Sequence, residues 1–121
     1  MILVDTSVWI DFFRQTDPAL DKKLTNLLDN MEVVALSAVF GELLQGAKNT
    51  MEEKTILEFW EYLPKIDEAG LFIEAGKLSR EFKLINKGVG LLDSYMLAAS
   101  KKYYLTLWTL DKKLLEAHAN L

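Results

Sequence analysis

Residues 1–7, M-I-L-V-D-T-S, decide the fold, because four apolar residues run directly into an acid and two hydroxyl side chains. A short apolar run bounded by polar residues is typical of a strand that is buried on both faces of a parallel sheet. Ligand sites in open parallel sheets lie at the carboxyl ends of the strands. Asp5 is therefore predicted at the mouth of a crevice. The alternative is that Asp5 merely ends the strand and Ser7 caps the next helix.

Strands and helices alternate along the rest of the chain. Short apolar runs predict strands at residues 32–36 and 105–108, with a weak candidate at residues 65–66. Helical spacing of apolar residues predicts helices at residues 8–14, 18–29, 37–46, 50–63, 68–87 and 92–103, and a final helix that ends near residue 119. Such alternation requires parallel strands joined by right-handed crossovers. The predicted fold class is therefore α/β, a three-layer α/β/α sandwich around a small parallel sheet.

Composition limits the classes of protein to consider. The 121 residues suit a single domain, residues 1–121, and half of them are hydrophobic, as in a globular core. There is no cysteine for disulfides or thiolate sites, so we expect a cytoplasmic protein. No apolar run reaches the roughly 18 residues of a membrane helix, and no signal peptide is recognisable. The net charge of −4 argues against a generic basic nucleic-acid binder, so any such contact must use local patches.

Acids recur where predicted elements begin or end. Asp5 follows the first strand, Glu42 lies one turn into the helix after the second strand, Asp93 opens a helix, and Asp111 follows the strand at residues 105–108. Because the strand ends of a parallel sheet converge, we expect these carboxylates to meet in one crevice. Their repulsion would raise some of their pKa values. A hard divalent cation such as Mg²⁺ or Mn²⁺ relieves that repulsion and prefers oxygen ligands.

An ordinary structural role is the alternative for each acid. Asp93 and Asp111 are also favourable charges at helix N-termini. Zinc is disfavoured, because the chain has no cysteine and a single histidine. A metal bound by carboxylates can activate water and stabilise charge on a phosphoryl oxygen.

Four segments together resemble the PIN-domain ribonucleases, specifically the VapC toxins of toxin–antitoxin pairs. They are D-T-S-V-W-I-D-F-F-R at residues 5–14, G-E-L-L-Q-G at 41–46, D-S-Y-M-L-A-A-S at 93–100 and L-W-T-L-D-K-K-L at 107–114. The resemblance implies that the four acids hold Mg²⁺ or Mn²⁺ and hydrolyse RNA. It also implies a sheet of four or five parallel strands, although the chain stops at Leu121, about where the family's fifth strand begins.

The resemblance and the side-chain lengths together give each acid a hypothetical role. Asp5 and Asp93 are direct metal ligands, Asp111 completes the ligand set directly or through water, and Glu42 acts through water or orients the nucleophile. Thr6 and Thr109 hydrogen-bond these carboxylates. The alternatives are a turn or cap hydroxyl for Thr6 and a strand-end hydroxyl for Thr109.

Two further groups of residues are candidate partner surfaces. Helical-wheel positions place four basic residues opposite the apolar face of the predicted helix at 68–87, where they either follow an RNA backbone or form a solvated face: Lys77, Arg80, Lys83 and Lys87. Trp9, Phe12 and Phe13 crowd the first helix and suggest an exposed groove. By resemblance this groove takes a VapB-type antitoxin segment, and a homodimer face is the alternative.

Other functions are weighed against the RNA-cleaving toxin. A structure-specific DNA nuclease shares the chemistry, but 121 residues leave little room for DNA-binding insertions. A non-cleaving PIN-type scaffold is disfavoured because all four acids are present. A phosphoacceptor receiver domain needs adjacent acids after the first strand, whereas Asp5 is followed by Thr6 and Ser7. The RNA target is either transfer RNA or ribosomal RNA by resemblance, and no residue selects between them.

Overall fold

A small parallel sheet lies at the centre of the computed structural model, which describes all residues from Met1 to Leu121. Its strands are β1 (Ile2–Val4), β2 (Val33–Val34) and β3 (Thr106–Trp108), in the spatial order β2-β1-β3. Leu3 of β1 pairs with Val34 on one side and with Leu107 on the other. Leu3 has no exposed surface, so the apolar N-terminal run forms the buried central strand that its sequence predicts.

The sheet has three strands, so the expectation of four or five is wrong. Residues 65–66 form no strand, although the same segment approaches β2 through one bond, in which Ala35 N donates to Pro64 O at 2.8 Å. A proline has no N–H with which to extend a ladder from this point. Residues 120–121, after the last helix, are not part of a strand, and Leu121 N donates to His118 O.

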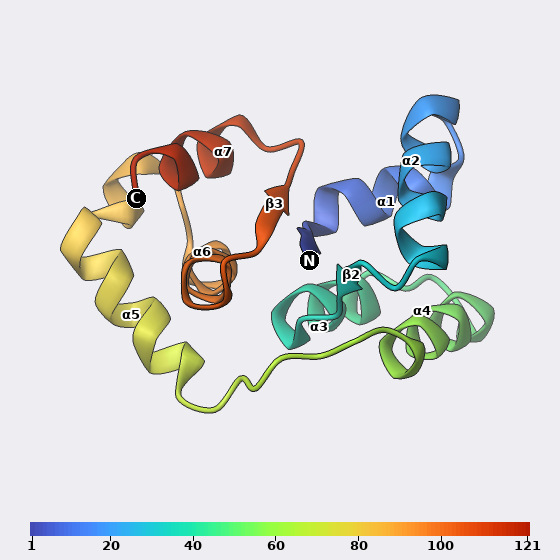
Figure 1. Cartoon of the computed structure of the whole chain (residues 1–121), viewed down its shortest axis with the longest axis horizontal. Coiled ribbons are helices and arrows are strands. Elements are labelled where there is room, and N and C mark those ends of the chain that lie inside the picture. The colour runs from blue at the N-terminus through green and yellow to red at the C-terminus, as the bar shows by residue number, and fades with distance from the viewer.

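Seven α-helices pack around this sheet, as expected for an α/β fold of three layers. In Figure 1 the strands lie between α1, α2 and α4 on one side and α5, α6 and α7 on the other. The helices are α1 (Thr6–Arg14), α2 (Pro18–Asp29), α3 (Ser37–Gln45), α4 (Thr50–Tyr62), α5 (Leu71–Phe82), α6 (Leu91–Tyr103) and α7 (Lys112–Ala119). None of them is long and apolar enough to cross a membrane.

The predicted helix over residues 68–87 is interrupted. The α-helical part, α5, ends at Phe82, Lys83 adopts a left-handed backbone with φ 53°, and a 3₁₀ turn, η1 (Leu84–Lys87), follows. A left-handed residue terminates an α-helix. Ile85, which a continuous helix over residues 68–87 would place on its apolar face, lies in the 3₁₀ turn and is 76% exposed.

This interruption also changes the predicted basic stripe. Lys77 and Arg80 lie on α5, whereas Lys83 is the left-handed residue after it and Lys87 ends the 3₁₀ turn. The four cations therefore do not share one face of a continuous helix. Lys77 is in addition paired with Glu74, at 3.8 Å between Nζ and Oε1.

The N-termini of three helices are capped differently. Helix α1 begins at Thr6, directly after Asp5, so Ser7 lies inside the helix and does not cap it. Helix α4 is capped by Asn49, whose side chain accepts from Glu52 N at 2.9 Å. Helix α2 is capped by the side chain of Asp17, in front of Pro18.

Candidate active site

The four predicted acids lie on four different elements at the carboxyl side of the sheet. Asp5 directly follows β1 and precedes α1, and Asp111 occupies the corresponding position between β3 and α7. Asp93 lies in the first turn of α6, and Glu42 lies on α3. Because β1 and β3 are parallel neighbours, Asp5 and Asp111 emerge at the same edge of the sheet.

The electrostatics of Asp93 show that these acids share one region. Its pKa is raised from 3.8 to about 6, first by burial and then by the negative charges of Asp5, Asp111 and Glu42, in that order. A hydrogen bond with the Gly90 backbone opposes the rise. Burial and nearby like charges both disfavour an ionised carboxylate. The fold therefore brings together acids that are far apart in the sequence.

Asp5 is held by two hydroxyl groups. Its Oδ2 accepts hydrogen bonds from Thr109 Oγ1 at 2.6 Å and from Ser7 Oγ at 2.7 Å. Thr109 Oγ1 also accepts from Asp111 N at 3.0 Å, and Ser7 Oγ accepts from Leu110 N at 3.1 Å. Only 5% of Asp5 is exposed, so these bonds compensate its burial and fix its orientation. Each hydroxyl thus ties the end of β1 to the loop after β3.

Ser7 is a site residue that the sequence analysis missed. It was assigned as a helix cap, whereas the structure gives it a bond to the Asp5 carboxylate and a bond from the loop after β3. The available signal was its position two residues after Asp5, from which a hydroxyl inside the first helical turn can reach back to the acid.

Glu42 and Asp111 have their own partners. Thr6 Oγ1 donates to Glu42 Oε1 at 2.9 Å, which links α1 to α3 beside Asp5. Asp111 Oδ1 accepts from Lys113 N at 2.9 Å and from Leu114 N at 3.4 Å, and so caps α7. The capping role that the sequence left open for Asp111 is present, and it engages one of the two carboxylate oxygens.

The donor chemistry of this region fits a hard divalent cation. All four candidate ligands offer carboxylate oxygens, which Mg²⁺ and Mn²⁺ prefer, and the raised pKa of Asp93 reflects repulsion that a cation would relieve. The side chains do not, however, form a closed ligand cluster in this structure, because no three acids or histidines lie in a metal-binding arrangement. The hydroxyl and capping bonds orient three of the acids individually.

A second network connects the helices that carry Glu42 and Asp93. Glu68, in the segment between α4 and α5, accepts hydrogen bonds from Ser37 N at 3.0 Å, from Ser37 Oγ and from Tyr95 OH. Helix α3 has Leu36 at its N-cap position, which offers no capping side chain, so Glu68 caps it from 31 residues away. Because Tyr95 belongs to α6, this carboxylate links the N-terminal ends of α3 and α6.

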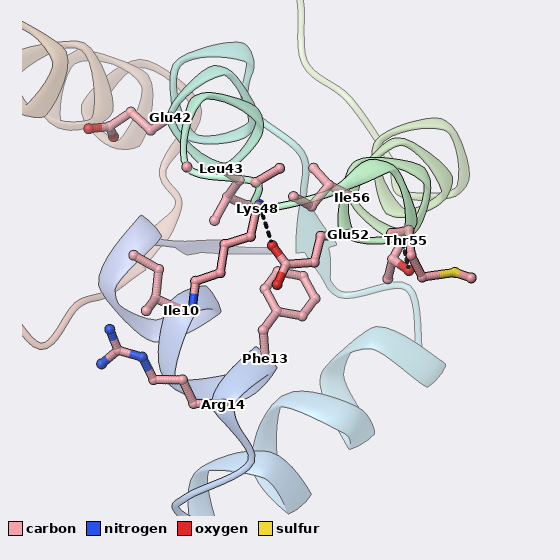
Figure 2. A pocket seen from close by; sticks show the side chains of 12 residues that line it. Ile10, Phe13, Arg14, Glu42, Leu43, Lys48, Glu52, Thr55 and Ile56 are labelled. Atoms are coloured by element: carbon pink, nitrogen blue, oxygen red, sulfur yellow. Dashed lines mark hydrogen bonds between the residues drawn. The ribbon is translucent and has the colours of Figure 1, made fainter.

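The predicted aromatic groove is only partly present. Trp9 is 1% exposed and cannot line a groove, because Phe40 and Phe59 pack against it with ring centroids 5.5 and 5.3 Å away. Phe12 is half-buried, packed against the core. Phe13 is 38% exposed and lines a cavity between α1, α3 and α4, where Glu42 also contributes to the wall (Figure 2).

Asp5, Glu42, Asp93 and Asp111 form an acidic centre at the carboxyl edge of the sheet, which is where open parallel α/β folds place their functional sites. The chain matches the PIN domain family over residues 2–120 and belongs to that family. PIN domains are generally metal-dependent nucleases. A comparison with curated proteins gives no match.

Proposed function

We propose that this PIN-domain protein is a Mg²⁺- or Mn²⁺-dependent endoribonuclease and the toxin of a VapC-type toxin–antitoxin pair. The observation that carries the nuclease is the raised pKa of Asp93, to which Asp5, Asp111 and Glu42 all contribute. Acids that are held close together, although their repulsion destabilises the protein, are typical of functional sites. The toxin role rests on the resemblance of the segments around these acids to VapC proteins.

Each acid has a proposed task. Asp5 and Asp93 would bind the cation directly, Asp111 would bind it directly or through water, and Glu42 would act through water or orient the nucleophile. A cation held there would lower the pKa of a bound water and neutralise charge on the scissile phosphate. Thr109 and Ser7 keep the Asp5 carboxylate oriented, and Thr6 does the same for Glu42.

The partners are proposals of the same kind. We expect a homodimer that a VapB-type antitoxin holds inactive, and transfer RNA and ribosomal RNA are both candidate substrates. A DNA nuclease is the alternative activity and a non-cleaving RNA-binding scaffold is the alternative without activity. Cleavage of RNA, of DNA or of neither distinguishes the two nuclease activities from the scaffold.

Purified protein is incubated with total cellular RNA, and separately with single-stranded and duplex DNA, with Mg²⁺, with Mn²⁺ or with a chelator. We expect discrete RNA fragments that require metal and disappear in Asp5→Asn and Asp93→Asn. The matched control is Asp29→Asn, which removes one exposed carboxylate at the end of α2. Cleavage of DNA alone would support the alternative nuclease. Undiminished RNA cleavage by Asp93→Asn would refute the proposed centre.

A further inference from the structure

A cavity of about 490 Å³ adjoins the acidic centre. It lies between α1, α3 and α4, and Figure 2 shows its wall side chains. Its volume is in the range of small-ligand sites, about 300–1,000 Å³. Glu42 is the residue common to the cavity and the acidic centre, so the two sites are adjacent.

Two cations from different elements meet at this cavity. Arg14 ends α1, and Lys48 lies in the loop between α3 and α4. Their charged ends point to the same side of the cavity, next to Ile10 (Figure 2). Neither forms an ion pair, because the single ion pair of the structure joins Lys77 and Glu74. Two unpaired like charges in one place are stabilised by an anion, and guanidinium and ammonium groups both bind phosphate.

Each acid of the cavity has a hydrogen-bond partner other than the charged groups of Arg14 and Lys48. Glu52 Oε2 accepts from the backbone N of Lys48 at 2.6 Å, so this carboxylate is directed to the loop backbone. The Glu42 carboxylate points away from Arg14 and Lys48 in Figure 2 and accepts from Thr6. The two cations are therefore available to a ligand.

The cavity also has an apolar surface, which contains an aromatic ring that packs on Trp9. Phe13 is 38% exposed and stacks on Trp9, with ring centroids 5.8 Å apart and planes at 26°. Trp9 is buried and fixed, so it holds the Phe13 ring in place from behind. Ile10 and Ile56 complete the apolar surface. Exposed aromatic rings beside cations are the elements with which proteins bind single-stranded nucleic acid.

We propose that this cavity is a nucleotide subsite, which binds a single-stranded RNA nucleotide next to the phosphate that is cut. Arg14 and Lys48 bind the phosphate of that nucleotide, and its base lies against Phe13. An unpaired base is required, because a base within a duplex cannot reach an aromatic ring. The proposal rests on the proposed nuclease function and adds to it the residues that bind the nucleotide beside the cleaved phosphate.

The first test measures binding without cleavage. A fluorescein-labelled single-stranded RNA is titrated with protein in chelator, and anisotropy gives Kd at several salt concentrations. Arg14→Gln/Lys48→Gln should weaken binding about tenfold or more and reduce the salt slope by about 1.4, since each lost phosphate contact contributes about 0.7 on single strands. The matched control, Lys22→Gln/Lys54→Gln, removes two exposed charges outside the cavity and should keep nearly the wild-type slope.

The second test locates the base. RNA containing 5-iodouridine is photo-crosslinked to the protein, and the crosslinked peptide is identified by mass spectrometry. We expect the crosslink on the α1 peptide that contains Phe13, and its loss in Phe13→Leu, which keeps an apolar side chain beside Trp9. Crosslinks that lie only elsewhere, with equal RNA affinity for the two double variants, would overturn the subsite and assign this cavity to a protein partner.

Failure of the subsite and failure of the nuclease give different results. If the nuclease proposal holds and the subsite does not, wild-type protein cuts RNA with metal and both double variants cut it equally well. If the nuclease proposal fails, wild-type protein cuts no RNA under any metal condition, and the subsite proposal is then refuted as well.

Discussion

Replacing Asp93 by asparagine should stabilise the metal-free protein, although it removes a proposed catalytic group. The pKa of Asp93 is about 6 in the folded protein, against an ordinary value of 3.8. A difference of about two pKa units corresponds to ~3 kcal/mol for a group fully removed from solvent. Asp93 is only partly buried, so solvent screening reduces the expected gain to ~1–2 kcal/mol.

The sign of the effect depends on pH. Because the folded pKa is raised, the folded state favours protonated Asp93, and the fold carries no penalty from this group below pH 3.8. The penalty develops as the pH rises through about 6, so Asp93→Asn and wild-type protein should differ little near pH 4 and most above pH 7. Asparagine has no charge to repel Asp5, Asp111 and Glu42.

Urea denaturation in chelator at pH 4 and pH 8 measures this difference. A gain of ~1–2 kcal/mol should raise the urea midpoint by about 0.5–1 M at pH 8. Asp29→Asn controls for the loss of any surface carboxylate and should change the midpoint little at either pH. A lower midpoint for Asp93→Asn at pH 8, or the same shift at both pH values, would refute the account of a shared acidic region.

Three further predictions concern the same region. Thr109→Val removes the donor to Asp5 and the acceptor for Asp111 N. It should lower the free energy of unfolding by ~1–2 kcal/mol and slow RNA cleavage about 10–100-fold in a single-turnover assay. Thr109→Ser keeps the hydroxyl and should retain wild-type stability and cleavage rate. Glu68→Ala removes the remote cap of α3 and should lower the free energy of unfolding by ~1–3 kcal/mol in urea denaturation. Glu74→Ala removes only the exposed ion pair with Lys77 and should lower it by less than about 0.5 kcal/mol. Mn²⁺ at about 100 times its Kd should stabilise wild-type protein by ~2.7 kcal/mol in the same assay and leave Asp5→Asn unchanged.

Each of these predictions has an outcome that would contradict it. Equal cleavage rates for the valine and serine variants at position 109 would remove that hydroxyl from the site. Equal losses for the alanine variants at positions 68 and 74 would mean that the remote cap contributes nothing. Stabilisation of Asp5→Asn by Mn²⁺ as large as that of wild type would place the cation elsewhere.

Local patterns were sufficient to predict the central strand and the positions of Asp5 and Asp111 beyond the carboxyl ends of neighbouring strands. The apolar run before Asp5 and the one before Thr109 each identify a strand, and parallel pairing then brings their carboxyl ends together. The sheet was overestimated because residues 65–66 have strand-like composition but follow Pro64, and only one backbone bond joins that segment to β2. Short strands carry little signal of their own.

Features that depend on distant partners could not be predicted from local patterns. The burial of Trp9 comes from Phe40 and Phe59, which belong to two other helices, so the pattern of α1 alone overstated its exposure. The capping of α3 comes from Glu68, 31 residues beyond Ser37. The left-handed backbone at Lys83 has no local signal, because lysine rarely adopts it, and it ended the predicted helix early.

The bond between Asp5 and Thr109 joins residues that are 104 positions apart. Contacts of such high sequence separation form late, because closing the long loop costs entropy before any contact repays it. Because the chain is synthesised from its N-terminus, Asp5 is made long before β3, Thr109 and Asp111, which pack around it in the folded protein. The acidic centre therefore forms only after β3 and Asp111 have been synthesised and have packed beside β1, and a shorter nascent chain lacks it.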